Sequence, residues 1–173
     1  MGCYIHIWAE IKKNNRWHLV DKEFTLSEYD RERLGVNKGH SPFNWQNYGL
    51  FGFLGDVRNY SCSEYLSKDR GLPNDVSSRL KLGHKQWGLD AHSASYIILK
   101  ELIEFDYDKT FWDRRITKQT GPNTWSGAAL AEEGEGEIIT YRQFLGDRFF
   151  IHLEELKSLG DPEDVRIVFW FDN

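Results

Sequence analysis

Two histidines stand in segments whose residue types suit proton transfer. His6 lies in "GCYIHIWAE" (residues 2–10), and His92 lies in "LDAHSAS" (residues 89–95). Imidazole changes its charge near neutral pH, so one ring can accept a proton while a second ring donates one. If both rings face one phosphodiester, His6 and His92 form a candidate catalytic pair for hydrolysis without a metal.

The segment around His6 alternates as a β-strand does. One face of this strand is apolar and consists of Cys3, Ile5, Ile7 and Ala9. The other face is polar and aromatic and consists of Tyr4, His6, Trp8 and Glu10. The apolar face is typical of a protein core, where Cys3 would be a buried and unreactive thiol. Tyr4 and Trp8 predict an aromatic wall of a ligand site beside His6.

The segment around His92 has the residue types found at the start of a helix. "SASYIILKELIEF" (93–105) predicts a helix that begins at Ser93, directly after Asp90 and His92. The first N–H groups of a helix lack internal partners and bind phosphate or carboxylate readily. Alternatively, Ser93 only caps the helix and His92 is an ordinary surface or core histidine.

A second candidate for anion binding follows the helical pattern of "NYGLFGFLGDVRNY" (47–60). Arg58 and Asn59 come at its end, where a guanidinium can hold an anion while an amide binds a polar edge of the ligand. Alternatively, the arginine only contacts the last carbonyl groups of the helix.

The spacing of potential metal ligands argues against a metal site. Cys3 and His6 are an odd number of residues apart, so on one strand they point to opposite faces. The sequence also lacks a phosphate-binding P-loop, a dinucleotide fingerprint, a G-x-S-x-G elbow and an H-E-x-x-H motif. We therefore expect neither a metal nor a cofactor.

Composition narrows the class of protein further. The 173 residues carry a net charge of -5, which argues against a partner such as duplex nucleic acid that needs a basic surface. No apolar run approaches the ~20 residues of a membrane span, so we expect no membrane association. Two cysteines, Cys3 and Cys62, are too few for a disulfide framework and fit a reducing cytoplasm. Aromatic residues make up 15% of the chain, which is consistent with a stacking surface.

The order of the periodic segments predicts a single α+β domain over residues 1–173. Residues 3–12 and 17–20 indicate a hairpin around Asn14-Asn15, and "VRIVFWFDN" (165–173) alternates as a second strand. We expect one antiparallel sheet from this hairpin and the C-terminal strand, with about four helices packed on its Cys3 face. The expected helices cover residues 47–60, 72–88, 93–105 and 140–160.

Two details of this expected fold concern caps and loops. Asp75 is the expected N-cap of the second helix, and Gly88 is its expected stop. Residues 107–137 show no clear period and include "EEGEGE" (132–137), which predicts an irregular and partly mobile loop.

Four blocks of the sequence resemble a largely uncharacterised family found in phage and prophage genomes. The blocks are "MGCYIH", "NYGLFGFLGDVRN", "GLPNDVS" and "WGLDAHSASYIILKEL". Members of that family open with Met-Gly/Ser-Cys-Asp-Ile-His, and the resemblance covers most of residues 1–105 and the C-terminal strand. The polar signature of the family falls on His6, Arg58, Asn59, Asp75, Asp90, His92 and Ser93. The chain departs from the family at Tyr4 and Gly49, where aspartate is usual.

The resemblance implies a phage-encoded protein that works in the cytoplasm of a host bacterium. Together with the aromatic wall, it suggests a counter-defence protein whose cleft takes a small nucleotide-like anionic signal and sequesters or cleaves it. The expected ligand-binding residues are Tyr4, Trp8, Arg58, Asn59, Asp90 and Ser93, beside the catalytic candidates His6 and His92.

Two other function classes remain open at this point. The protein can be an inhibitor of a host immune protein or a host-takeover factor, with no small-molecule ligand. It can also be a structural or accessory phage protein. Each of these interpretations is compatible with a homo-oligomer.

Overall fold

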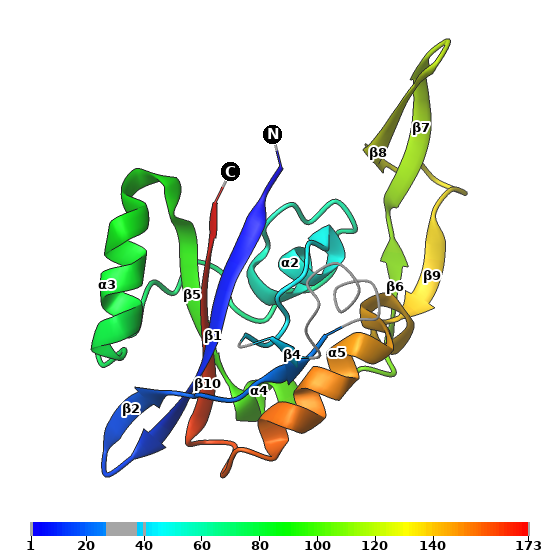
Figure 1. Cartoon of the computed structure of the whole chain (residues 1–173). Coiled ribbons are helices and arrows are strands. Elements are labelled where there is room, and N and C mark those ends of the chain that lie inside the picture. The colour runs from blue at the N-terminus through cyan, green and yellow to red at the C-terminus, as the bar shows by residue number, and fades with distance from the viewer. Residues whose placement is uncertain (1, 27–37, 40, 173) are drawn as a thin grey trace.

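A four-stranded antiparallel sheet, in the order β2-β1-β10-β5, carries the fold (Figure 1). The computed structural model describes residues 2–26, 38–39 and 41–172. The strands of the sheet are β1 (Tyr4–Lys13), β2 (Arg16–Leu19), β5 (His92–Ile98) and β10 (Val165–Asp172). The predicted α+β class is confirmed, and so is the pairing of the N-terminal hairpin with the C-terminal strand.

The hairpin turn is where the sequence places it. Asn14 and Asn15 join β1 to β2 and both have a positive φ, of 50° and 59°. A two-residue turn between antiparallel strands requires this left-handed conformation, which asparagine tolerates better than most residues. The turn fixes the register in which Glu10 pairs with Leu19.

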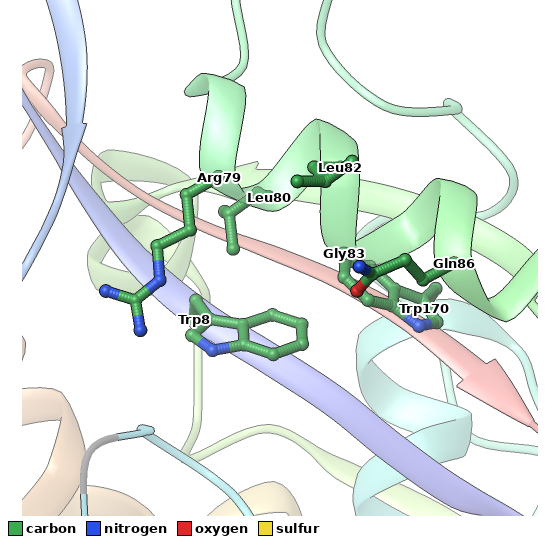
Figure 2. A pocket seen from close by; sticks show the side chains of 7 residues that line it. All are labelled: Trp8, Arg79, Leu80, Leu82, Gly83, Gln86 and Trp170. Atoms are coloured by element: carbon green, nitrogen blue, oxygen red, sulfur yellow. The ribbon is translucent and has the colours of Figure 1, made fainter.

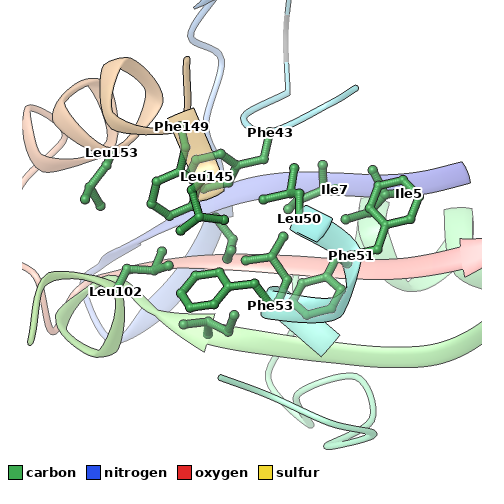
Figure 3. Close-up of a cluster of buried hydrophobic side chains, with 14 of the residues drawn as sticks. Ile5, Ile7, Phe43, Leu50, Phe51, Phe53, Leu102, Leu145, Phe149 and Leu153 are labelled. Carbon is green, nitrogen blue, oxygen red and sulfur yellow. The ribbon is translucent and has the colours of Figure 1, made fainter. Parts of the chain in front are cut away.

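Among the described residues, four α-helices and a short 3-10 helix surround the sheet. They are α2 (Tyr48–Gly55), α3 (Ser78–Trp87), η1 (Gly88–Asp90), α4 (Leu99–Glu104) and α5 (Tyr141–Lys157). The inner face of the sheet carries Cys3, Ile5 and Ile7, and α2, α4 and α5 pack against it (Figure 3). Phe149 and Leu156 of α5 are fully buried against this face.

Helix α3 lies on the opposite side of the sheet from the other three helices (Figure 1). We call this side the outer face; it presents Tyr4, His6 and Trp8 of β1 and Trp170 of β10. We had expected every helix on the Cys3 face. Because β10 is a central strand and is buried on both sides, its outer residues also need cover.

The predicted helix over residues 93–105 is wrong in its first half. Residues His92–Ile98 form β5, and only Leu99–Glu104 are helical. The run Tyr96, Ile97, Ile98 is aromatic and β-branched, and it finds a long ladder partner in β10. His92 therefore begins a strand instead of preceding a helix.

The predicted irregular loop over residues 107–137 consists largely of strands. They are β6 (Thr110–Asp113), β7 (Arg115–Gly121), β8 (Thr124–Leu130) and β9 (Glu137–Thr140). β6 pairs with β9, and β7 with β8 forms a hairpin, here called the arm, that extends away from the rest of the protein (Figure 1). The strands of the arm could not be predicted from the sequence, because neither of them has a buried face that would require alternating apolar residues. A further pair joins β3 (Phe24–Thr25) to β4 (Lys38–Gly39).

A buried ion pair on the outer face joins the two central strands. Glu10 and Arg166 are cross-strand partners, and their side chains are 0% and 3% exposed. Arg166 Nη2 lies 2.7 Å and Nε 2.8 Å from Glu10 Oε2. The guanidinium also lies 3.9 Å from the centre of the Trp17 ring of β2.

The same pair anchors the segment that leads into α3. Glu10 Oε1 accepts a hydrogen bond from the backbone N–H of Ser77, and Arg166 Nη1 lies 2.8 Å from Asp75 Oδ1. Asp75 also accepts a hydrogen bond from Trp17 Nε1. The prediction that Asp75 is the N-cap of α3 is therefore wrong. Ser77 occupies that position. The predicted stop at Gly88 is confirmed as the C-cap.

We expect Arg166→Met to lower the free energy of unfolding by about 3–5 kcal/mol, because it leaves Glu10 buried without its partner. Urea denaturation measures this change. The double variant Glu10→Gln with Arg166→Met should be less destabilised than the sum of the two single variants. Lys100→Met is the control, since the Lys100–Glu163 pair is exposed and should contribute less than about 1 kcal/mol. An equal loss in the Arg166 and Lys100 variants would contradict this role.

A buried histidine fixes helix α5 to the N-terminal half of the chain. His152 Nδ1 accepts a hydrogen bond from the Phe43 backbone N–H at 2.8 Å, and Nε2 donates to the Thr25 carbonyl at 2.6 Å. These two partners require the neutral imidazole with its proton on Nε2. Burial accordingly lowers the pKa of His152 from its ordinary value of 6.5.

This histidine makes stability depend on pH. The unfolded chain takes up a proton near pH 6.5 while the folded protein resists it, so stability falls as pH drops below about 6.5. Urea midpoints at pH 7.5 and 5.5 should differ in this direction. His152→Asn, whose amide oxygen replaces Nδ1, should reduce the difference, and the exposed His18→Asn should keep it. A midpoint that is unchanged between the two pH values would refute the assignment.

Candidate functional site

A groove between α3 and the outer face of the sheet is the candidate functional site (Figure 2). It has a volume of about 270 Å³. Its lining consists of Trp8, Arg79, Leu80, Leu82, Gly83, Gln86 and Trp170. Trp8 and Trp170 come from neighbouring strands, and their ring centres are 4.6 Å apart.

The aromatic layer continues from the groove to His6. The His6 ring lies 4.2 Å from the ring of Trp87 and 5.9 Å from that of Trp170. His6 Nε2 lies 3.1 Å from Asp172 Oδ2, and this contact fixes the ring on the outer face. The predicted aromatic wall therefore faces α3, except that Tyr4 at its end is 55% exposed.

Two polar groups give the groove its chemistry. Arg79 lies at one end of the groove (Figure 2), and in the described part of the chain its guanidinium has no hydrogen-bond or ion-pair partner. Trp170 is fully buried, and its Nε1–H has no partner among the described residues. A buried donor without a partner costs about 1–3 kcal/mol. The groove thus combines flat aromatic walls with a cation, which suits a planar ring that carries negative charge.

The histidine pair predicted from the sequence does not face a single cleft. The strand register pairs His6 with Trp170 on the outer face, and His92 with Phe171 on the inner face. The His92 ring also stacks on the Phe171 ring, with centres 6.1 Å apart. The two imidazoles therefore lie on opposite sides of the sheet and do not flank one phosphodiester.

Arg58 and Asn59 lie apart from the groove, in the turn after α2. Arg58 Nη1 donates to the Tyr60 hydroxyl at 3.2 Å, and the guanidinium lies 6.0 Å from the Tyr48 ring. It also neighbours Cys3, which is fully buried as predicted, and burial raises the pKa of that thiol against the opposing effect of Arg58. Arg58 thus belongs to the inner side of the sheet.

The amide of Asn59 closes its own loop. It donates to Asp56 Oδ1 and to the Ser63 carbonyl, and its oxygen accepts from the Ser63 N–H and hydroxyl. This set of bonds leaves the amide engaged within the loop, so its contribution is to loop structure.

The remaining predicted site residues lie around the start of β5. Asp90 is exposed in η1, and Ser93 has a positive φ of 51° where the β5–β10 register shifts. The Ser93 hydroxyl lies 3.2 Å from His92 Nδ1. Of the residues predicted from the sequence, the structure places Trp8 in the groove and His6 beside it.

Of the seven residues that line the groove, the sequence singled out only Trp8. Arg79 and Gln86 stand on an exposed helix among other polar residues, and nothing in their spacing separates them from a solvated face. Trp170 alternates with core residues in β10, so the sequence indicates that it lies on the outer face of the sheet. The sequence does not indicate that α3 covers this face. The only available signal was the aromatic outer face of β10 beside that of β1.

Three general tests of the molecule give negative findings. Among residues 2–26, 38–39 and 41–172, no three histidine, cysteine or acidic side chains gather where they could hold a metal ion. Within the same ranges, no helix has the length and apolarity needed to cross a membrane. Comparison with protein-family models, curated proteins and solved structures finds no match to this chain.

Gly83 provides a test of how α3 sits on the sheet. A Cβ atom at this position would lie 3.7 Å from Trp170 Cη2, which is an ordinary van der Waals contact. Since glycine inside a helix costs about 0.5–1 kcal/mol relative to alanine, Gly83→Ala should raise the free energy of unfolding by that amount. Urea denaturation measures it. A destabilised variant would show that residue 83 of α3 lies too close to Trp170 to accommodate a methyl group.

Proposed function

We propose that the protein binds a small nucleotide-like anionic ligand in the groove between α3 and the outer face of the sheet. The observation that carries this proposal is the pair of tryptophans that walls the groove beside the unpaired Arg79. Aromatic faces stack on nucleobases irrespective of sequence, and a guanidinium binds phosphate through a planar set of donors.

The size of the groove limits what it can enclose. Its volume of about 270 Å³ lies just below the ~300–1,000 Å³ of typical ligand pockets. We therefore propose that the groove encloses one base, while the sugar and phosphates extend toward Arg79. Because His6 and His92 lie on opposite faces of the sheet, sequestration fits this geometry better than cleavage by a histidine pair.

The resemblance to phage proteins suggests which ligand is biologically relevant. A phage protein that sequesters a nucleotide-type signal of a host immune system would act as a counter-defence protein. The proposed setting is the host cytoplasm, where such signals are made.

Binding to a panel of mono-, di- and cyclic nucleotides, measured by calorimetry, tests this proposal. Arg79→Ala should weaken binding by about 1.5–3 kcal/mol, the usual scale for a hydrogen bond to a charged group, and Trp8→Ala by about 1–3 kcal/mol. Lys85→Ala is the matched control, because Lys85 stands on the same helix without lining the groove. Equal losses in the Arg79 and Lys85 variants would refute the assigned site.

Chromatography of the same mixtures separates the modes of action. Intact nucleotide released by denaturation indicates sequestration, and new products indicate an enzyme. No binding to any member of the panel would favour the second candidate, a protein–protein inhibitor. One observation favours that candidate: Leu82 and Leu89, on α3 and η1, are 58% and 103% exposed, and exposed leucines of this kind suit a protein contact.

A further inference from the structure

One face of helix α3 has a polar side chain at each end and a gap in its middle. Arg79, Gly83 and Gln86 stand at positions i, i+4 and i+7 of the helix, so they follow one another along the same face. All three line the groove (Figure 2). Because Gly83 has no side chain, the wall of the groove is hollow between the two polar residues.

The two polar residues are far enough apart to bind opposite ends of one nucleotide. Seven helical positions separate Arg79 from Gln86, which is about 10.5 Å along the axis at the usual rise per residue. Figure 2 shows the guanidinium of Arg79 beside Trp8, whereas the side chain of Gln86 lies beside Trp170 at the other end. If Arg79 binds the phosphate, as proposed above, the base lies toward Gln86.

The amide of Gln86 is available to a ligand. The side chain is exposed, and among the described residues it has no hydrogen-bond partner. The turn of α3 that carries it is held on the sheet by the residues on either side. The His84 ring packs edge-on against Trp170 with ring centres 5.2 Å apart, and the Trp87 ring lies 4.2 Å from His6. Gln86 therefore offers a donor and an acceptor side by side from a backbone that is fixed in place.

A carboxamide binds best to the edge of a base that carries a donor next to an acceptor. Adenine has such an edge at its N6 amino group and N7, to which glutamine donates and accepts one hydrogen bond each. The N6 amino group and N1 form a second edge of the same kind. On guanine, N7 and O6 are both acceptors, so the corresponding edge leaves one of the two bonds unmade. A purine also reaches further from the sugar than a pyrimidine, which suits the separation of Arg79 and Gln86.

We infer that Gln86 selects the base and that the ligand is an adenine nucleotide. This inference rests on the proposed binding of a nucleotide in the groove. The phosphate binds Arg79 and the base lies against Trp8, and both contacts are the same for every nucleotide. The N6 amino group of adenine and the ring nitrogen next to it bind the amide of Gln86. Discrimination between bases therefore depends on this one side chain.

Calorimetry with two ligands tests the contact between Gln86 and the amino group. Adenosine monophosphate and purine-riboside monophosphate differ only in the 6-amino group. The native protein should bind adenosine monophosphate about 5-fold more tightly, because without the amino group the amide oxygen loses its donor. Gln86→Met keeps the length of the side chain without the amide and should bind both ligands equally. Lys85→Met is the matched control, since Lys85 is the preceding residue of α3 and does not line the groove, and it should keep the preference.

Gln86→Glu tests the same contact by reversing the preference. A carboxylate only accepts hydrogen bonds, and N1–H and the N2 amino group of guanine both donate. The affinity for guanosine monophosphate relative to adenosine monophosphate should therefore rise about 5-fold or more. Circular dichroism checks that each variant is folded.

The outcomes separate this inference from the proposed function. A native protein that binds both test ligands equally, a Gln86→Met variant that keeps the preference, or a Gln86→Glu variant whose relative affinity does not rise overturns the role of Gln86. Nucleotide binding and its loss in Arg79→Ala would then still support the groove as the site. If no nucleotide binds, the proposed function fails and the selection of adenine fails with it.

Discussion

The buried pair of Glu10 and Arg166 is the constraint on which the outer side of the molecule depends. Burying two charges is favourable only when each finds several partners, and here the partners come from β2, from the segment before α3 and from the two central strands. The pair therefore fixes where α3 starts, and through α3 it fixes the height of the groove above Trp8 and Trp170. Asp75 is a polar residue that could be taken for part of a catalytic site, but it binds Arg166 and so holds the segment before α3 in place.

The parts of the fold that were predictable from the sequence are those where burial follows a simple period. β1 and β10 alternate clearly, and the apolar stripe of α5 repeats at helical spacing, so both follow from the chain alone. Residues Tyr96, Ile97 and Ile98 form a short apolar run that fits a strand and a helix equally well. Its partner β10 decides between them, and that partner lies about 70 residues away in the sequence. The arm was missed because strands without a buried face leave no period to detect.

The candidate site was predictable only on the β1 side. Alternation placed His6 and Trp8 on one face, and the structure retains that assignment. It could not indicate that His92 belongs to the opposite face, because this depends on the register of β5 against β10. Arg58 and Asn59 illustrate a second limit: capable polar groups in a loop are engaged within that loop or beside it. Arg79 could not be found, because its importance comes from where α3 lies.

The central position of β10 also has a consequence for how the protein is made. β10 lies between β1 and β5, so residues 165–172 join strands that were synthesised long before them. Until these residues leave the ribosome, β1 and β5 have no common neighbour, and their apolar faces stay accessible to other chains. Non-local pairings of this kind form slowly, and transiently exposed strands favour aggregation. The growing chain is thus open to aggregation until β10 has paired with both strands.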